Sequence, residues 1–168
     1  AYATAGVEAL DLFNAIADAA RPQLGKFSSQ ELANTAWAFA TAGVEVRALF
    51  IAIADVARPP LGKFTSQALA NMAWAFACVD SKDSQCFSEL LGAAAATKCL
   101  NERDLSQFYV VSLHCRLEWP TLDFPIVESQ QELQDAYRRC KTRASRLQRD
   151  VAAALDRIGW THVFEHET

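Results

Sequence analysis

Apolar residues recur at helical spacing in the first two thirds of the chain. On a helical wheel, residues 28–41 place one group of apolar side chains on a single arc: Leu32, Ala33, Ala36, Phe39 and Ala40. The opposite arc carries polar side chains: Gln30, Glu31, Asn34, Thr35 and Thr41. A second apolar run at helical spacing follows closely: Val46, Phe50, Ile53 and Ala57. The pattern therefore predicts two consecutive amphipathic helices.

The start of the first helix is marked by a capping signal. Ser28 can serve as the N-cap while Glu31, three residues later, reaches back to it, and Phe27 can pack on Leu32 as a hydrophobic staple. Thr65 occupies the corresponding position 37 residues later. We therefore expect two first helices that begin in the same way.

The ends of both helices are marked as well. Gly43 suits the left-handed residue that follows a helix, and Arg58 before Pro59 predicts the end of the second helix. The many alanines allow neighbouring helices to approach closely, so hairpins of this kind are expected to stack side by side.

This two-helix pattern is an internal repeat. A shift of 37 residues aligns residues 3–40 with residues 40–77, and 29 of the 38 positions are identical. A weaker third copy appears at a shift of 36, where Leu100, Leu105 and Gln107 take the places of Phe64, Leu69 and Asn71, and Val110 stands in place of the tryptophan. Residues 1–3 match residues 38–40, so we expect the sequence to open inside a unit. The predicted fold is all-α, an α-solenoid of stacked hairpins of about 37 residues over residues 1–118.

The pattern changes after the repeats. Residues 119–128 contain two prolines and are expected to form a linker. Residues 129–158 carry one apolar stripe at helical spacing and predict a long amphipathic helix. Residues 159–168 alternate like a strand and are expected to be the start of a truncated C-terminal domain.

Composition narrows the class of protein. Apolar residues make up 51% of the chain and charged residues 21%, which fits a soluble globular protein, and no apolar stretch is long enough for a membrane span. The net charge of −4 weighs against nucleic-acid binding on bulk charge alone. The five cysteines form no CxxC motif and are expected to be reduced core thiols.

Few residues suggest catalysis. His162 and His166 would lie too far apart on a strand to share a metal ion, and the neighbours His114 and Cys115 point apart. The sequence contains no Gly-rich phosphate loop or GxSxG motif. We therefore expect no enzyme, no metal, no cofactor and no small-molecule substrate.

The repeated pattern Phe-x-x-Gln-x-Leu-Ala-Asn-x-Ala-Trp-Ala-Phe-Ala resembles the octotricopeptide-type repeats of algal and protist organelle proteins. These repeats are similar to the helical region of the Fas-activated serine/threonine kinase-like proteins. The resemblance covers about residues 1–115, and residues 145–160 resemble the segment that leads into a RAP domain. It implies binding of single-stranded RNA in a mitochondrion or plastid, with a role in RNA processing, stability or translation. Ribosomal or RNA-processing proteins are further implied partners, and any targeting segment is absent from this chain.

Two sets of positions are candidates for RNA contact in the first helices. The amides beside Trp37 and Trp74 could bind base edges, one base per repeat: Gln30, Asn34, Gln67 and Asn71. Alternatively, Asn34 and Asn71 satisfy backbone groups between stacked units while both tryptophans fill the core. The second set comprises positions on the expected solvent side that differ between copies and could set sequence preference, although drift at exposed positions would also explain them: Glu31, Thr35, Ala68, Met72, Asp104 and Phe108.

Basic side chains are candidates for phosphate contact. Each unit repeats one arginine and one lysine between its helices, Arg21 with Lys26 and Arg58 with Lys63. A denser group lies in the predicted long helix: Arg138, Arg139, Lys141, Arg143, Arg146 and Arg149. Both sets could instead be solvated surface charge. The alternative function is a solenoid scaffold that binds proteins and makes no direct contact with RNA.

Overall fold

The computed structural model describes residues 10–79, 84–97, 100–126 and 130–140. In chain order its elements are α1 (Leu10–Ala20), η2 (Arg21–Lys26), α2 (Ser29–Thr41), α3 (Arg47–Ala57), η3 (Leu61–Lys63), α4 (Ser66–Cys78), α5 (Ser84–Ala95), α6 (Glu102–Glu118) and α7 (Gln130–Arg139). These residues contain helices and no strand, which confirms the all-α prediction for this part of the chain. The predicted opening of the repeat at residues 1–3, the long helix beyond residue 140 and the C-terminal strand lie outside the described residues.

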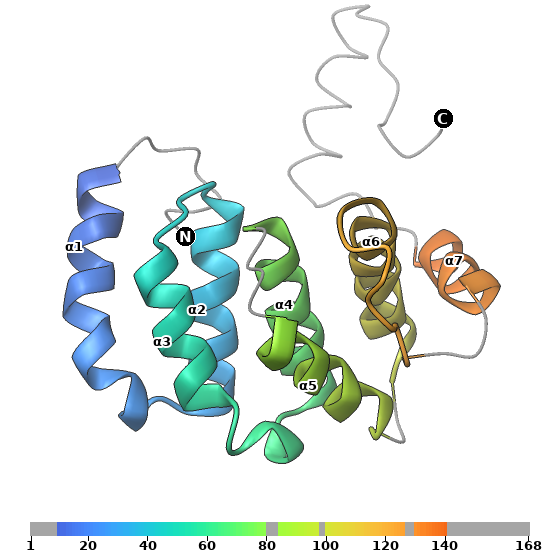
Figure 1. The fold of residues 1–168 in the computed structure, drawn as a ribbon, viewed down its shortest axis with the longest axis horizontal. Helices are drawn as coiled ribbons and strands as arrows, with labels where there is room; N and C mark the ends of the chain where they lie inside the picture. The colour runs from blue at the N-terminus through green and yellow to red at the C-terminus, as the bar shows by residue number, and fades with distance from the viewer. Residues whose placement is uncertain (1–9, 80–83, 98–99, 127–129, 141–168) are drawn as a thin grey trace, which may run out of the picture.

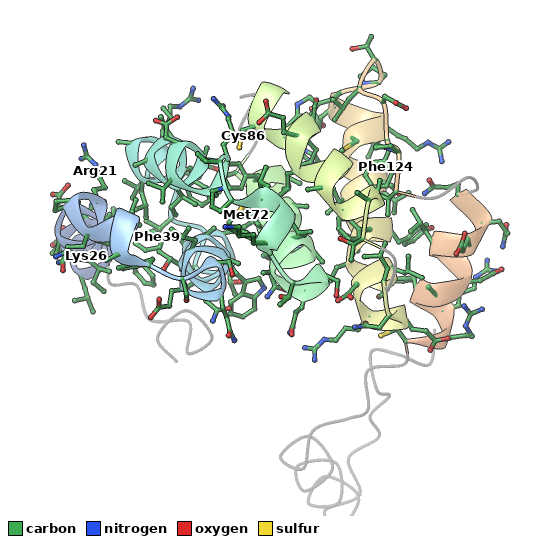
Figure 2. The ribbon with its side chains drawn as sticks, turned by 90° about the horizontal axis from the view of Figure 1, so that it is seen from below. Arg21, Lys26, Phe39, Met72, Cys86 and Phe124 are labelled. Atoms are coloured by element: carbon green, nitrogen blue, oxygen red, sulfur yellow. The ribbon has the colours of Figure 1, made fainter. Side chains whose placement is uncertain are left out.

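The helices pack in the order of the chain. α2 lies beside α4, α4 lies beside α6, and α6 packs against α7. Figure 1 shows the helices following one another across the molecule, and α3 and α5 lie on one side of α2 and α4 in both views (Figures 1 and 2). The predicted first helices of three successive units are therefore neighbours in space.

The N-terminus of α2 has the predicted cap. The Glu31 backbone N–H donates to Ser28 Oγ at 3.3 Å, and the Ser28 backbone N–H donates to Glu31 Oε2 at 2.7 Å. In α4 the Ala68 N–H donates to Thr65 Oγ1 at 3.2 Å, and Ala68 has no side-chain acceptor to return the bond. These bonds satisfy backbone donors that the first turn of a helix leaves unpaired.

Replacing Ser28 with alanine is expected to lower the free energy of unfolding by about 1 kcal/mol, because α2 loses its N-cap. The hydrogen bonds from the Ser28 backbone and hydroxyl lower the pKa of Glu31, so this carboxylate stabilises the fold above its ordinary pKa. That part of the stability is lost as the pH falls through the lowered pKa. Urea unfolding at pH 7 and pH 3 measures both effects, with Ser29→Ala as the control. An equal loss for Ser28→Ala at both pH values would contradict the role of Glu31.

The C-terminus of α2 also agrees with the sequence prediction. Gly43 has a φ of 66°, a conformation that side chains other than glycine rarely adopt. Its N–H donates to Ala40 O at 3.1 Å, and the Val44 N–H donates to Phe39 O at 3.0 Å. These two bonds form a Schellman motif, which ends the helix and turns the chain toward α3.

An aromatic contact recurs with the period of the sequence. Phe13 of α1 meets Phe39 of α2 edge-on, with ring centroids 5.2 Å apart. Phe50 of α3 meets Phe76 of α4 in the same way at 5.6 Å. Phe50 lies 37 residues after Phe13, and Phe76 lies 37 residues after Phe39. In the next unit Phe87 of α5 contacts Trp119, just after α6, so residues of the predicted linker pack on the core. The sequence repeat therefore corresponds to a repeated packing contact.

The cysteines differ in their exposure. Cys86 and Cys115 are buried, Cys140 is half-buried and Cys78 is exposed. The prediction of a core thiol is wrong for Cys78, because this residue ends α4 at the position that Thr41 takes in α2. Burial raises the pKa of Cys115 to about 11, which keeps this side chain protonated at neutral pH. Cys99 lies outside the described residues.

Alkylation of the folded protein at neutral pH is expected to modify Cys78 at least about tenfold faster than Cys86 or Cys115, because only exposed thiols react without local opening of the fold. Peptide mapping by mass spectrometry after timed alkylation measures the three rates separately. In denaturant the three rates should converge. Equal rates in the folded protein would contradict the burial of Cys86 and Cys115.

Candidate nucleic-acid interface

One polar position of the repeat forms a row across three helices. Gln107 Nε2 of α6 donates to Asn71 Oδ1 of α4 at 2.9 Å. Asn34 holds the equivalent position on α2, where it is exposed, while Asn71 and Gln107 are half-buried. The sequence alternative in which Asn71 satisfies a backbone group between units differs from the structure, because the partner of Asn71 on the next helix is the side-chain amide of Gln107. Asn34 stays open to solvent.

Two tryptophans lie next to this row. The rings of Trp37 and Trp74 have centroids 6.4 Å apart and planes inclined at 36°. Both side chains are half-buried, so neither tryptophan is fully enclosed by the core. Trp74 also packs against core residues. α2 and α4 thus present two neighbouring indole rings that are partly open to solvent.

A further turn of each helix adds exposed polar groups. Gln30 of α2 and Gln67 of α4 are exposed, as predicted. The equivalent residue of α6 is Arg103, which is exposed and makes no ion pair with the described part of the chain. Arg103 is absent from the sequence-based candidates, although the 36-residue shift places it at this position. We define the open face as these three rows: Gln30, Gln67, Arg103, Asn34, Asn71, Gln107, Trp37 and Trp74.

Four of the six variable positions do not face solvent as predicted. Ala68, Met72, Asp104 and Phe108 are all buried, with exposed fractions of 4% or less. Figure 2 shows Met72 on the side of α4 that faces α2 and α3. These four side chains cannot contact RNA bases, because neighbouring helices cover them. Their variation reflects helix packing.

The repeat position that Glu31, Ala68 and Asp104 share also has a role at the start of each helix. Glu31 and Asp104 are the third residues of capping boxes on α2 and α6, where the Asn101 N–H donates to Asp104 Oδ2 at 3.2 Å. The capping box of α6 is absent from the sequence predictions, although the Asn-x-x-Asp spacing marks it. In α2 the Thr35 hydroxyl donates to the Glu31 backbone oxygen at 2.7 Å. Glu31 is exposed and Thr35 is half-buried, so local hydrogen bonds occupy both residues.

Most of the candidate arginines are paired with carboxylates. The nitrogen-to-oxygen distances are 3.6 Å for Arg21 with Asp18, 3.3 Å for Arg58 with Glu89, 4.0 Å for Arg138 with Asp135 and 2.8 Å for Arg139 with Glu102. These surface ion pairs reduce the positive potential that each arginine offers to a phosphate. The remaining basic candidates of the predicted long helix lie outside the described residues: Lys141, Arg143, Arg146 and Arg149.

The two lysines of the loops are different. Lys26 ends η2 and Lys63 ends η3, and both side chains are exposed. Neither makes an ion pair within the described ranges. Both turns lie at the same end of the molecule, next to the N-termini of α2 and α4 (Figure 1). Figure 2, which is seen from that end, labels Lys26 together with Arg21.

Other kinds of site find no support in the described residues. They contain no group of three side chains that could hold a metal ion. None of their helices combines the length and apolarity of a membrane span. Comparison of the chain with family models, curated proteins and solved structures finds no match.

Proposed function

We propose that the chain is part of an α-solenoid that binds single-stranded RNA across the open face of α2, α4 and α6. The observation that carries the proposal is the alignment of equivalent side chains on adjacent helices. The Asn71–Gln107 hydrogen bond and the Trp37–Trp74 contact both join positions that are one repeat apart. A linear polymer such as single-stranded RNA, in which similar units follow one another at regular spacing, matches such a surface.

The chemistry of the open face suits unpaired bases. Indole rings stack on bases of any sequence, and amide groups can both donate to and accept from the edges of a base. Asn34, Gln30 and Gln67 are exposed, so their amides are accessible to a ligand. Asn71 is already bonded to Gln107, and an RNA base would have to share or replace that bond.

Phosphate contact is assigned to Lys26, Lys63 and Arg103, which are exposed and make no ion pair within the described residues. Arg47 and Arg116 share both properties but lie outside the open face and its neighbouring turns. Three cations are a small number, in keeping with the net charge of −4. For single-stranded RNA, each neutralised phosphate contributes a slope of about −0.7 to log K against log salt. The proposal therefore predicts a modest slope of about −2 if all three side chains make contact.

Titration of homopolymer RNA over a salt series tests this function. The wild-type chain is expected to lose affinity as salt rises, and the double variant Lys26→Gln/Lys63→Gln is expected to show a slope shallower by about 1.4. Lys26 and Lys63 are exposed at the ends of the short elements η2 and η3, so their replacement should leave the α-helices intact, which circular dichroism checks. Binding that is absent at low salt would exclude the function.

A role in organellar RNA processing, stability or translation follows from the resemblance to octotricopeptide-type repeats, and we include it in the proposal. The second candidate is a scaffold that binds proteins. It is favoured by the carboxylate partners of Arg21, Arg58, Arg138 and Arg139, which leave little net positive charge. Salt-insensitive binding to a protein, with none to RNA, would select this second function.

A further inference from the structure

Two equivalent apolar side chains are exposed in one copy of the repeat and buried in the next. Leu12 and Ile16 of α1 are 42% and 43% exposed. Their equivalents 37 residues later, Leu49 and Ile53 of α3, are 0% exposed. We define the Leu12 face as the surface of α1 formed by Leu12 and Ile16. Leu and Ile are residue types that usually pack at helix interfaces, yet both side chains are exposed here.

A difference in helix orientation does not explain the exposure. Phe13 and Phe50 make the same edge-on contact with the following first helix, through Phe39 and Phe76. Ala17 of α1 is 0% exposed, and its equivalent in α3 is also buried. α1 and α3 therefore present the same side to the next unit, and they differ in what covers the adjoining positions Leu12 and Ile16 of α1 and their equivalents in α3.

The elements that pack on α3 from the preceding part of the chain are α2 and η2. They carry buried apolar side chains, among them Leu24 of η2 and Leu32 and Phe39 of α2. Leu49 and Ile53 are fully buried, and α2 and η2 are the preceding elements that lie against their helix. On α1 no described element takes their place. The interface that the Leu12 face would make is thus already made once within this molecule.

We propose that the Leu12 face is a docking surface for an amphipathic, alanine-rich helix with the sequence pattern of α2. Such a helix would cover Leu12 and Ile16 as α2 and η2 cover Leu49 and Ile53. The partner is a segment of polypeptide outside the described residues that carries the first-helix pattern of this repeat. The proposal concerns an edge of the molecule and does not depend on RNA binding by the open face.

A synthetic peptide with the sequence of residues 27–44 is the probe, because it contains α2 with both of its caps. Titrated against the full chain, it is expected to bind saturably, and Leu12→Glu/Ile16→Glu should weaken binding at least about tenfold by placing charge in an apolar interface. Ile51→Glu is the matched control, because Ile51 is 47% exposed on α3 and should leave binding unchanged. No saturable binding, or equal binding by the double variant, would overturn the proposal.

A second measurement is needed because a short peptide loses conformational entropy when it folds on binding, and this loss weakens the binding of the peptide. Residues 1–6 match residues 38–43 in five of six positions, so adding the sequence of residues 27–37 before Ala1 completes a first helix in the same chain. This extension should raise the midpoint of thermal unfolding, and Leu12→Glu/Ile16→Glu should abolish the rise. An unchanged midpoint would contradict the proposal. A dimer of the unextended chain that the double variant dissociates would overturn it in favour of a second copy.

Discussion

Replacing Phe50 with alanine is expected to lower the free energy of unfolding by about 3–5 kcal/mol, the largest loss that we predict for a single substitution. Phe50 is 1% exposed, and its ring meets Phe76 edge-on at 5.6 Å. The substitution removes the buried ring and leaves a cavity between α3 and α4, which the surrounding alanines are too small to fill. The contact belongs to the repeated set, so its loss should separate two successive units.

Urea unfolding measures this loss as a lower midpoint with an unchanged slope. Ile51→Ala is the control, because the neighbouring side chain is 47% exposed and its removal should change stability by no more than about 0.5 kcal/mol. A loss below about 1 kcal/mol for Phe50→Ala would contradict the close packing of Phe50 against Phe76.

Replacing both Trp37 and Trp74 with alanine is expected to cause the largest loss of RNA affinity, if the proposed function holds. Stacking of one base on an aromatic side chain contributes about 1–3 kcal/mol, so each tryptophan should account for a loss of roughly 5- to 150-fold in affinity. The two rings lie 6.4 Å apart, so they are expected to hold neighbouring bases of one strand.

The experiment compares the double variant with Trp37→Phe/Trp74→Phe, which keeps an aromatic ring at each position and should retain much of the affinity. Trp74 also packs on the core, so thermal unfolding of both variants separates loss of the fold from loss of the binding surface. Equal RNA affinity of wild type and the alanine variant would remove the tryptophans from the proposed interface.

The local signals in the sequence predicted the local structure well. Ser28, Glu31 and Gly43 act within one turn of a helix end, and the structure shows the predicted cap and the predicted left-handed residue there. The apolar arc of α2 is also confirmed, since Leu32 and Phe39 are buried. Each of these features depends on residues at most a few positions apart, so a single stretch of sequence contains the whole cause.

The burial of Met72 could not be predicted from its own helix. Thr35 and Met72 take the same position of the repeat, yet Thr35 is half-buried and Met72 is 1% exposed. A wheel of one helix separates a core side from a solvent side. A first helix in the middle of a row is covered on further sides by its neighbours, so α4 buries an arc wider than the wheel of α2 suggests.

The charged surface depends in the same way on contacts between distant parts of the chain. Arg58 meets Glu89 at 3.3 Å, and Arg139 meets Glu102 at 2.8 Å. Each pair joins residues more than thirty positions apart in sequence, on elements whose relative placement the repeat pattern does not give. The sequence identified the basic side chains, and the tertiary structure determines which of them are neutralised.

The repeated edge-on contact between phenylalanines has a consequence for how the chain finds its native state. Phe13 and Phe50 hold the same position of the repeat on α1 and α3, and Phe39 and Phe76 lie on nearly identical receiving helices. A mispaired arrangement in which α1 docks on α4 would use the same side chains as the native one and skip a unit. Only the length of the intervening chain disfavours it. Near-identity of successive copies is therefore expected to create a kinetic trap during refolding. Divergence of the third copy, where Ser112 holds the position of Phe76 and Phe87 meets Trp119, limits the number of such traps.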